Sequence, residues 1–178
     1  MSTLVGESVA ERIDAIDWRH VATDLDERGS AAIEAVLTVD ECTGLARLYR
    51  DDERFRKRIV MEQHGFGRGE YRYFRYPLPD IVGALRAAIY PHLAPVANRW
   101  SEAMRSDVRY PPEHAQFIAR CHAAGQELPT PLLLRYGAGD YNRMHQDLYG
   151  PHVFPLQVVI LLSEPGNEFT GGEFVLTE

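Results

Sequence analysis

The pattern of apolar side chains changes near residue 130, and this change limits the folds that the chain can adopt. In residues 1–129, N-cap residues and apolar positions three or four residues apart predict mainly helices. In residues 130–178, short apolar runs between turn-forming residues predict strands. Helices followed by strands are typical of an α+β domain in which helices pack on one side of a sheet. We therefore expect a single domain of this class over residues 1–178.

Local capping signals define the predicted helices. Asp17 is placed to cap a helix and Gly29 to end it, and Thr38-Val39-Asp40-Glu41 has the pattern of a capping box. Pro91 and Pro95 must kink or divide the helical stretch in which they lie, because proline lacks the N–H that a helix interior needs. The predicted helices are Trp18–Arg28, about 39–49, a stretch that begins at Asp80, and about 112–124.

Strand signals are concentrated after residue 130. Leu132-Leu133-Leu134 is apolar throughout and predicts a buried strand, whereas Met144 to Leu148 alternates in polarity. Turn-forming residues at 137–140 and 164–167 separate these runs. The predicted strands are Ser30–Leu37, Glu70–Tyr76, Leu132–Leu134, Met144–Leu148, Phe154–Ser163 and Glu173–Thr177.

Composition argues against several classes of protein. The formal net charge of -7 disfavours general binding of polyanions, and no stretch has the roughly 20 apolar residues of a membrane span. Residues 1–10 lack the basic start and apolar core of a signal peptide. Cys42 and Cys121 have no pairing or zinc-site spacing. We expect a cytoplasmic protein without a membrane partner, and its oligomeric state stays open.

His145 and Asp147 are the residues that carry chemistry. Because they are two positions apart on a predicted strand, both side chains should project from the same face, with Gln146 pointing away. An imidazole and a carboxylate that converge in this way could supply two ligands of a 2-His-1-carboxylate site for Fe(II). His-x-Asp by itself is a short pattern that also occurs by chance, so the surrounding residues decide its meaning.

Those surrounding residues resemble a known superfamily. The run from Arg135 to Asp147 resembles the first-strand signature of the 2-oxoglutarate/Fe(II) dioxygenases, and Arg-Tyr-x-x-Gly before His-Gln-Asp is similar to the alkylated-DNA repair branch. Tyr-x-x-Gly-x-x-Tyr and the later Gly171-Gly172-Glu173-Phe174 are similar to prolyl hydroxylases. The resemblance covers about residues 132–178. Leu134 departs from the repair branch, which has asparagine there, so a polar contact to the cosubstrate is missing or supplied elsewhere.

The resemblance implies a fold, cofactors and site residues. The fold is a double-stranded β-helix, or jelly roll, with N-terminal helices packed on it. The cofactor is Fe(II), held by His145 and Asp147, and 2-oxoglutarate and O2 are cosubstrates. Tyr136 corresponds to the tyrosine that binds the 2-oxoglutarate carboxylate; the alternative is a half-buried core tyrosine.

The same resemblance implies residues that these 178 do not contain. The family supplies a second histidine and then a basic residue for 2-oxoglutarate well after the Gly-Gly turn, and both are expected beyond Glu178. His152 comes only five residues after Asp147 and is better explained as an exposed loop residue. The four or five candidate strands in the second half of the chain fall short of the about eight strands of a jelly roll. The expectation is an incomplete core in a C-terminally truncated chain that does not itself turn over substrate.

The substrate is the least constrained prediction. Residues 53–76 are rich in arginine and aromatic residues and lie where repair dioxygenases carry a nucleotide-binding lid, although a solvated amphipathic hairpin has the same composition. Oxidative demethylation of alkylated bases in single-stranded or damaged DNA is therefore one prediction. A second prediction is hydroxylation of a protein residue or small molecule. A third is that the chain is a non-catalytic jelly-roll binding module. The candidate substrate-binding residues are Tyr141, Arg143, Arg72, Tyr73 and Tyr76.

Overall fold

The protein was analysed as a computed structural model that describes residues 6–147 and 150–176. These residues form two compact units, which we call the helical unit and the sheet unit. The helical unit comprises Met1–Thr38, Pro77–Leu128 and Leu148–Val158, and the sheet unit comprises Val39–Tyr76, Pro129–Asp147 and Val159–Glu178. The single domain expected from the sequence stays a prediction. Within the described part of the chain, no helix is both long enough and apolar enough to cross a membrane.

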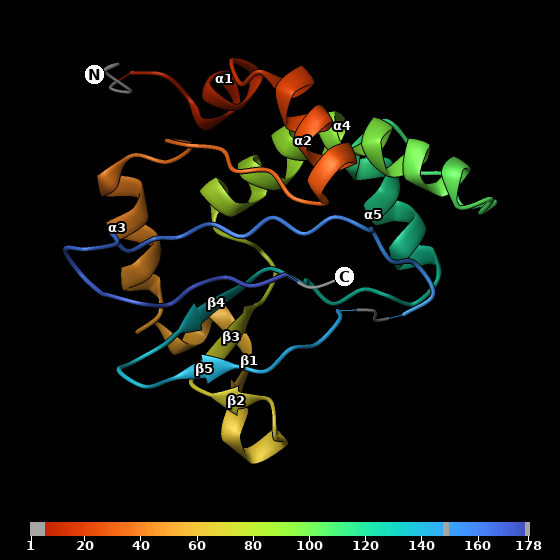
Figure 1. Ribbon diagram of the computed structural model, residues 1–178. Helices are drawn as coiled ribbons and strands as arrows, with labels where there is room; N and C mark the ends of the chain where they lie inside the picture. The colour runs from red at the N-terminus through yellow and green to blue at the C-terminus, as the bar shows by residue number, and fades with distance from the viewer. Residues whose placement is uncertain (1–5, 148–149, 177–178) are drawn as a thin grey trace. The chain divides into compact units, whose positions relative to one another are not determined.

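The helical unit is built around one long helix (Figure 1). Helix α4 contacts the other three, and side chains from α4 and α5 form a buried core on which Phe154 and Leu156 pack. Its helices are α1 (Val9–Asp14), α2 (Trp18–Arg28), α4 (Asp80–Ala103) and α5 (His114–Ala123).

Two of these helices show how local signals and packing compete. The predicted bounds of α2 are confirmed: the Asp17 side chain accepts hydrogen bonds from the backbone N–H groups of Arg19 and His20, and Gly29 closes the helix with a φ of 70°. Pro91 and Pro95 do not divide α4, which is one continuous helix. Its buried residues around both prolines pack against the rest of the unit, and this burial offsets the lost backbone hydrogen bonds.

The sheet unit contains two small antiparallel sheets (Figure 1). The larger has the strand order β1-β3-β4, and the smaller pairs β2 with β5. The mixed helix and sheet content confirms the α+β class, whereas the jelly roll stays a prediction. The elements are α3 (Val39–Leu48), the 3-10 turns η1 (Asp52–Arg54) and η2 (Met61–His64), β1 (Phe55–Val60), β2 (Gly67–Arg68), β3 (Glu70–Phe74), β4 (Leu132–Arg135) and β5 (Tyr141–Asn142).

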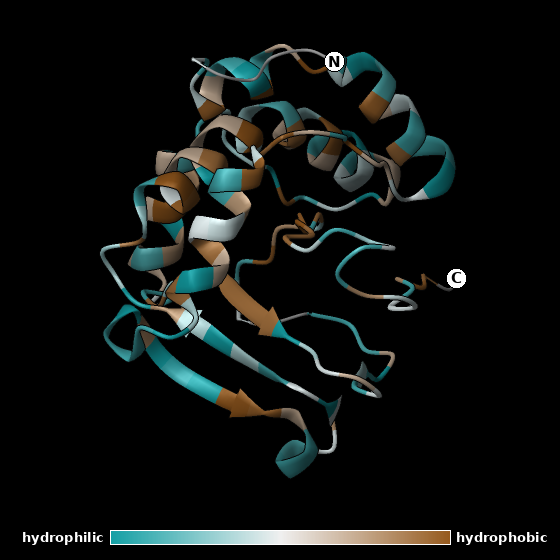
Figure 2. Cartoon of the chain, turned by 90° about the vertical axis from the view of Figure 1, so that its left-hand side faces the viewer, coloured by the Kyte–Doolittle hydropathy of each residue, from teal (hydrophilic) through white to brown (hydrophobic). Residues whose placement is uncertain are grey.

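Alternation along β3 gives the larger sheet two unlike faces. Glu70, Arg72 and Phe74 project from one face, and Tyr71 and Tyr73 from the other. The register carries this division to the neighbouring strands, since Arg72 lies opposite Arg58 of β1 and Leu133 of β4. Figure 2 shows that β1 is hydrophilic in its middle and hydrophobic at its end.

Several predicted strands are wrong. Residues 30–37, 144–147, 154–163 and 173–176 form no strand, while Leu148 and Thr177 lie outside the described residues. The strand 132–134 is confirmed, but it is not buried, because Leu134 is 45% exposed. The physical reason is common to the four missing strands. A strand needs a neighbour for its backbone hydrogen bonds, and an apolar pattern alone does not supply one.

Candidate functional site

His145 and Asp147 lie together although no strand holds them. The His145 Nε2 atom is 3.6 Å from the Asp147 Oδ1 atom, and their side chains are 47% and 41% exposed. The sequence placed them on one strand face, whereas the structure joins them through the irregular segment that follows β5. The predicted convergence of the two groups therefore holds without the predicted strand.

A backbone contact fixes the orientation of the His145 ring. Its Nδ1 atom lies 2.7 Å from the Arg143 carbonyl oxygen, which can only accept, so the neutral ring carries its proton on Nδ1. The Nε2 lone pair is then directed to the side where Asp147 lies. This arrangement is typical of metal-binding histidines, whose second nitrogen donates to a carbonyl or carboxylate group.

The pair fits two neighbouring positions on one metal ion. Donor atoms bound at right angles to a first-row metal, each at about 2.1 Å, lie about 3 Å apart. The observed 3.6 Å requires only a small movement of two exposed side chains. Within residues 6–147 and 150–176, no three His, Cys, Asp or Glu side chains are grouped to hold a metal. The pair alone could therefore supply two ligands of such a site.

Tyr136 follows β4 and enters the turn that leads to β5. The turn is held by the Gly137 N–H, which donates to Asp140 Oδ2 at 2.7 Å. The ring lies against Gly69, where a Cβ atom would come within 2.8 Å of Tyr136 Cδ1. Burial raises the pKa of the Tyr136 phenol, and a hydrogen bond from Asn142 partly opposes this rise. The phenol is therefore protonated at neutral pH and can donate to an anion.

The predicted lid segment is hydrogen-bonded to the segment that leads to His145 and Asp147. Gly67 and Arg68 of β2 pair with Asn142 and Tyr141 of β5. The ladder is extended by the Arg143 N–H, which donates to the Phe66 carbonyl oxygen at 2.8 Å. Gly67 makes this approach feasible, because a Cβ atom there would lie 2.2 Å from the Tyr141 carbonyl oxygen. The side chains of Phe66, Tyr141 and Met144 are exposed around this junction.

The other predicted substrate residues have partners within the sheet unit. Arg72 forms an ion pair with Asp52 and lies over the ring of Tyr49. Tyr73, on the opposite face, is covered by the guanidinium group of Arg56, 4.3 Å from the ring centre. Tyr76 is exposed after β3, and the role in substrate binding stays a prediction for all of these residues. His152 belongs to the helical unit, where its backbone N–H and carbonyl group bond the Gln126 side chain.

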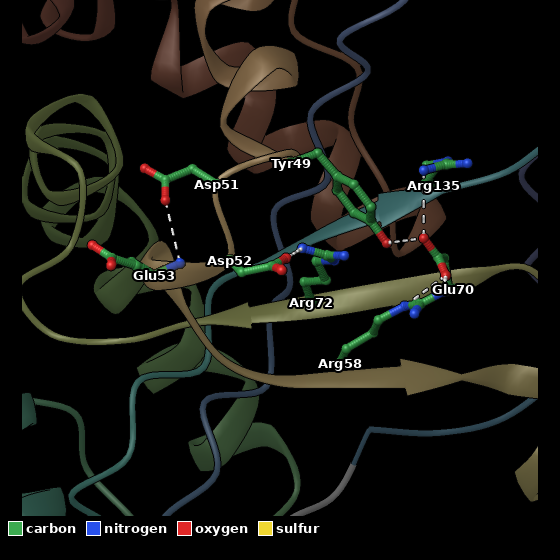
Figure 3. A network of polar contacts seen from close by, with 8 residues as sticks. All are labelled: Tyr49, Asp51, Asp52, Glu53, Arg58, Glu70, Arg72 and Arg135. Atoms are coloured by element: carbon green, nitrogen blue, oxygen red, sulfur yellow. Dashed lines mark hydrogen bonds and ion pairs between the residues drawn. The ribbon is translucent and has the colours of Figure 1, made fainter.

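Sequence reasoning missed a polar network centred on Glu70 (Figure 3). Tyr49 Oη donates to Glu70 Oε1 at 2.9 Å, Arg58 Nε donates to Oε2 at 2.8 Å, and Arg135 Nη1 lies 3.6 Å from Oε1. Burial alone would raise the pKa of Glu70, but the hydrogen bonds from Arg58 and Tyr49 outweigh it and hold the pKa below its ordinary value. Alternation along β3 was the available signal, since it places Glu70 beside Arg72.

Comparison with known proteins adds a family. A family model described as "Oxygenase, catalysing oxidative methylation of damaged DNA" matches residues 69–178. Two proteins of Mycobacterium tuberculosis, from strains CDC 1551 / Oshkosh and ATCC 25618 / H37Rv, are each 48% identical over 105 residues, and both are described as uncharacterized. The match covers 59% of this chain and 45% of each relative, so the chain spans less than half of these curated relatives. No solved structure matches.

Proposed function

Because this chain belongs to the family of oxygenases described as acting on damaged DNA, we propose that it contributes the metal- and cosubstrate-binding part of an Fe(II)- and 2-oxoglutarate-dependent dioxygenase. The observation that carries this proposal is the His145–Asp147 pair. Its Nε2 and Oδ1 atoms are 3.6 Å apart, both side chains are accessible, and the Nδ1 contact with the Arg143 carbonyl oxygen leaves the Nε2 lone pair available to a metal.

Each group has a separate task in this proposal. His145 Nε2 and Asp147 Oδ1 would hold Fe(II), and the protonated phenol of Tyr136 would donate a hydrogen bond to a carboxylate of 2-oxoglutarate. When bound, Fe(II), 2-oxoglutarate and O2 would supply the oxidation that hydroxylates a substrate C–H bond, with succinate and carbon dioxide as coproducts. The chain itself orients the side chains that would bind them. The Arg143 carbonyl group fixes the His145 ring, and Gly69 leaves room for the Tyr136 ring.

We propose that the substrate is a methylated base in single-stranded or damaged DNA. The exposed rings of Phe66 and Tyr141 lie on the β2–β5 junction and could stack on a base taken out of the duplex. Tyr141 lies four residues before His145. Hydroxylation of an N-methyl group gives an N-hydroxymethyl group that loses formaldehyde. Although the family description names methylation, the reaction that we propose is therefore oxidative demethylation.

A substrate-dependent turnover assay tests this function. The chain at its full natural length, with Fe(II), 2-oxoglutarate and O2, should release succinate and formaldehyde when given a methylated single-stranded oligonucleotide. The unmethylated oligonucleotide should give far less. His145→Ala should abolish turnover and weaken metal binding by at least about 100-fold, since loss of a residue that only supports a ligand already costs about 10- to 100-fold. His152→Ala is the matched control, because it removes a histidine outside the pair, and it should leave both unchanged.

Other results of the same assay would replace the proposal. Succinate release stimulated by peptides or free amino acids, and not by methylated DNA, would point to a hydroxylase. No binding of Fe(II) or 2-oxoglutarate by the full-length chain would leave a binding module. Metal binding that survives in His145→Ala would remove the assignment of the ligand pair.

A further inference from the structure

A hollow lies at the start of β1, at an edge of the larger sheet. It has a volume of about 290 Å³ and is lined by Asp52, Phe55, Arg56, Lys57, Arg58 and Arg72, which we call the β1 hollow. Four of these side chains are cationic and one is anionic. β1 is an edge strand, separated from β4 by β3. The β1 hollow is therefore a different place from the turn after β4 that carries Tyr136.

Irregular pairing gathers the cations at this edge. The register between β1 and β3 shifts between Phe55 and Lys57, so Arg56 lies in a bulge. Arg56 turns over the Tyr73 ring and its Nε donates to the Pro129 carbonyl oxygen at 3.2 Å. Lys57 and Arg58 then project from opposite faces of β1 beside the bulge. A regular strand would have separated these side chains more evenly.

Arg72 and Asp52 are unequal partners in the β1 hollow. The Arg72 side chain is only 15% exposed, whereas the Asp52 side chain that pairs with it is 87% exposed. The Nε atom of Arg72 is buried and has no hydrogen-bond partner within the described part of the chain. A guanidinium group removed from water in this way requires an anion beside it. Asp52 supplies that anion. Because its side chain is largely exposed, the carboxylate can leave Arg72 and be hydrated with little loss of free energy.

We propose that the β1 hollow binds a backbone phosphate of a nucleic-acid strand, and that the Asp52 carboxylate occupies the phosphate position until the strand displaces it. Phosphate matches the planar guanidinium fork of Arg72, and the exposed Lys57 adds charge at the rim. Only the choice of nucleic acid as the source of the phosphate rests on the proposed function.

Two variants that each remove one negative charge test whether a phosphate displaces the Asp52 carboxylate. Binding of unmethylated oligo(dT) to the full chain is measured without Fe(II) or 2-oxoglutarate. Asp52→Asn removes the competing carboxylate and should tighten binding about threefold, since an exposed ion pair is weak. Asp51→Asn is the matched control: Asp51 pairs with Arg54 and does not line the hollow. Equal tightening in both variants would mean a general charge effect and would overturn the proposal, as would no tightening in Asp52→Asn.

Lys57 provides a second measurement, because it is the single lysine among these 178 residues. Bound oligo(dT) should protect its amine from acetylation, followed by mass spectrometry of the peptide that contains it. Lys57→Ala should reduce the slope of log affinity against log salt by about 0.7, the contribution of one phosphate contact to a single strand. Unchanged acetylation and an unchanged slope would overturn the proposal.

Two further probes distinguish a nucleic-acid phosphate from free phosphate and from the phosphate of a lipid headgroup. Inorganic phosphate, or vesicles of phosphatidylserine and phosphatidylcholine, should protect Lys57 less than oligo(dT) does at the same phosphate concentration. Stronger protection by either would overturn nucleic acid as the ligand. These measurements need no methylated base, metal or turnover. A failure of the proposed oxygenase function would therefore leave them unaffected, and a failure here would leave the His145–Asp147 assignment standing.

Discussion

The core of the helical unit and the C-terminal segment of the sheet unit use their apolar side chains in opposite ways. In the helical unit, Tyr90, Ala97 and Phe117 are buried in one aromatic core. In the sheet unit, the segment from Val159 to Leu176 exposes large apolar side chains, with Phe174 72% exposed. A helix satisfies its own backbone hydrogen bonds and needs only a packing partner, whereas a strand needs a neighbouring strand as well.

The difference separates stability from chemistry. The contacts that hold the helical unit are mainly apolar, and deleting one should have a large effect on folding. The sheet unit holds the candidate ligands and two polar clusters at exposed or half-buried positions, where single changes should have small effects on folding. The three predictions below test this division, from the largest expected effect to the smallest.

Phe117→Ala should lower the free energy of unfolding by about 3 kcal/mol. Phe117 is buried and contacts the rings of Tyr90, Tyr110 and Phe154, so truncation leaves a cavity in the core. Urea denaturation measures the effect. Val108→Ala, at an exposed position of the same unit, is the control and should change the value by less than about 0.5 kcal/mol. His145→Ala should be as mild as the control, and a loss comparable to that of Phe117→Ala would break the comparison.

The same division explains what the sequence could predict. The bounds of α2 follow from Asp17 and Gly29, which act on backbone groups within four residues of themselves. The expected strand at 154–163 depends on partners that no local pattern specifies, and no described strand pairs with it. In α4, the prolines signalled a break that burial of the surrounding residues overrides. Local signals were thus reliable where the interaction itself is local.

The candidate site shows the same limit. His145 and Asp147 were paired from their spacing, and the structure brings them together through the Arg143 carbonyl contact in place of the expected strand. The sequence indicated Arg72 as a candidate substrate-binding residue. It did not indicate that Arg72 pairs with Asp52, which is 20 residues away. Likewise, nothing near Tyr136 in sequence indicates that Gly69 makes room for its ring. Contacts between distant segments decide the last two features, and the sequence alone does not indicate which segments come together.

His114 should make the stability of the helical unit depend on pH. Burial, with a smaller effect of Arg86, lowers the pKa of His114 from 6.5 to about 4. In the unfolded chain the ring binds a proton below about pH 6.5, whereas the folded protein resists protonation until about pH 4, so stability falls as the pH is lowered through this window. The full shift would correspond to about 3 kcal/mol, and partial exposure reduces our expectation to about 2 kcal/mol.

His114→Gln should reduce the loss of stability between pH 6.5 and 4 by about 2 kcal/mol, measured as the free energy of unfolding, and leave the contribution of the carboxyl groups. His122→Gln is the matched control, because His122 is an exposed residue of the same helix, and its curve should stay parallel to that of the wild type. If the loss of stability at low pH is unchanged in His114→Gln and reduced in His122→Gln, then His122 causes it and the prediction for His114 is wrong. Such a result would also mean that water reaches the His114 side chain more readily than its burial indicates.

Tyr49→Phe should have the smallest effect, about 1 kcal/mol in the free energy of unfolding. The variant keeps the ring beneath Arg72 and removes only the hydroxyl group that donates to Glu70 at 2.9 Å. Glu70 keeps its hydrogen bond from Arg58, so no buried charge is left without a partner. Because the Tyr49 bond helps to lower the pKa of Glu70, its loss should also raise that pKa towards the ordinary value.

The pH dependence separates this network from simple packing. A carboxyl group with a lowered pKa stabilises the fold above its unfolded pKa, and that contribution is lost as the pH falls through the folded pKa. Tyr49→Phe should therefore show a smaller acid-induced loss of stability than the wild type, whereas Tyr141→Phe, an exposed tyrosine outside the network, should show the same loss. A loss above about 3 kcal/mol at neutral pH in Tyr49→Phe would mean that the polar network carries the fold of the sheet unit as strongly as the aromatic core carries that of the helical unit.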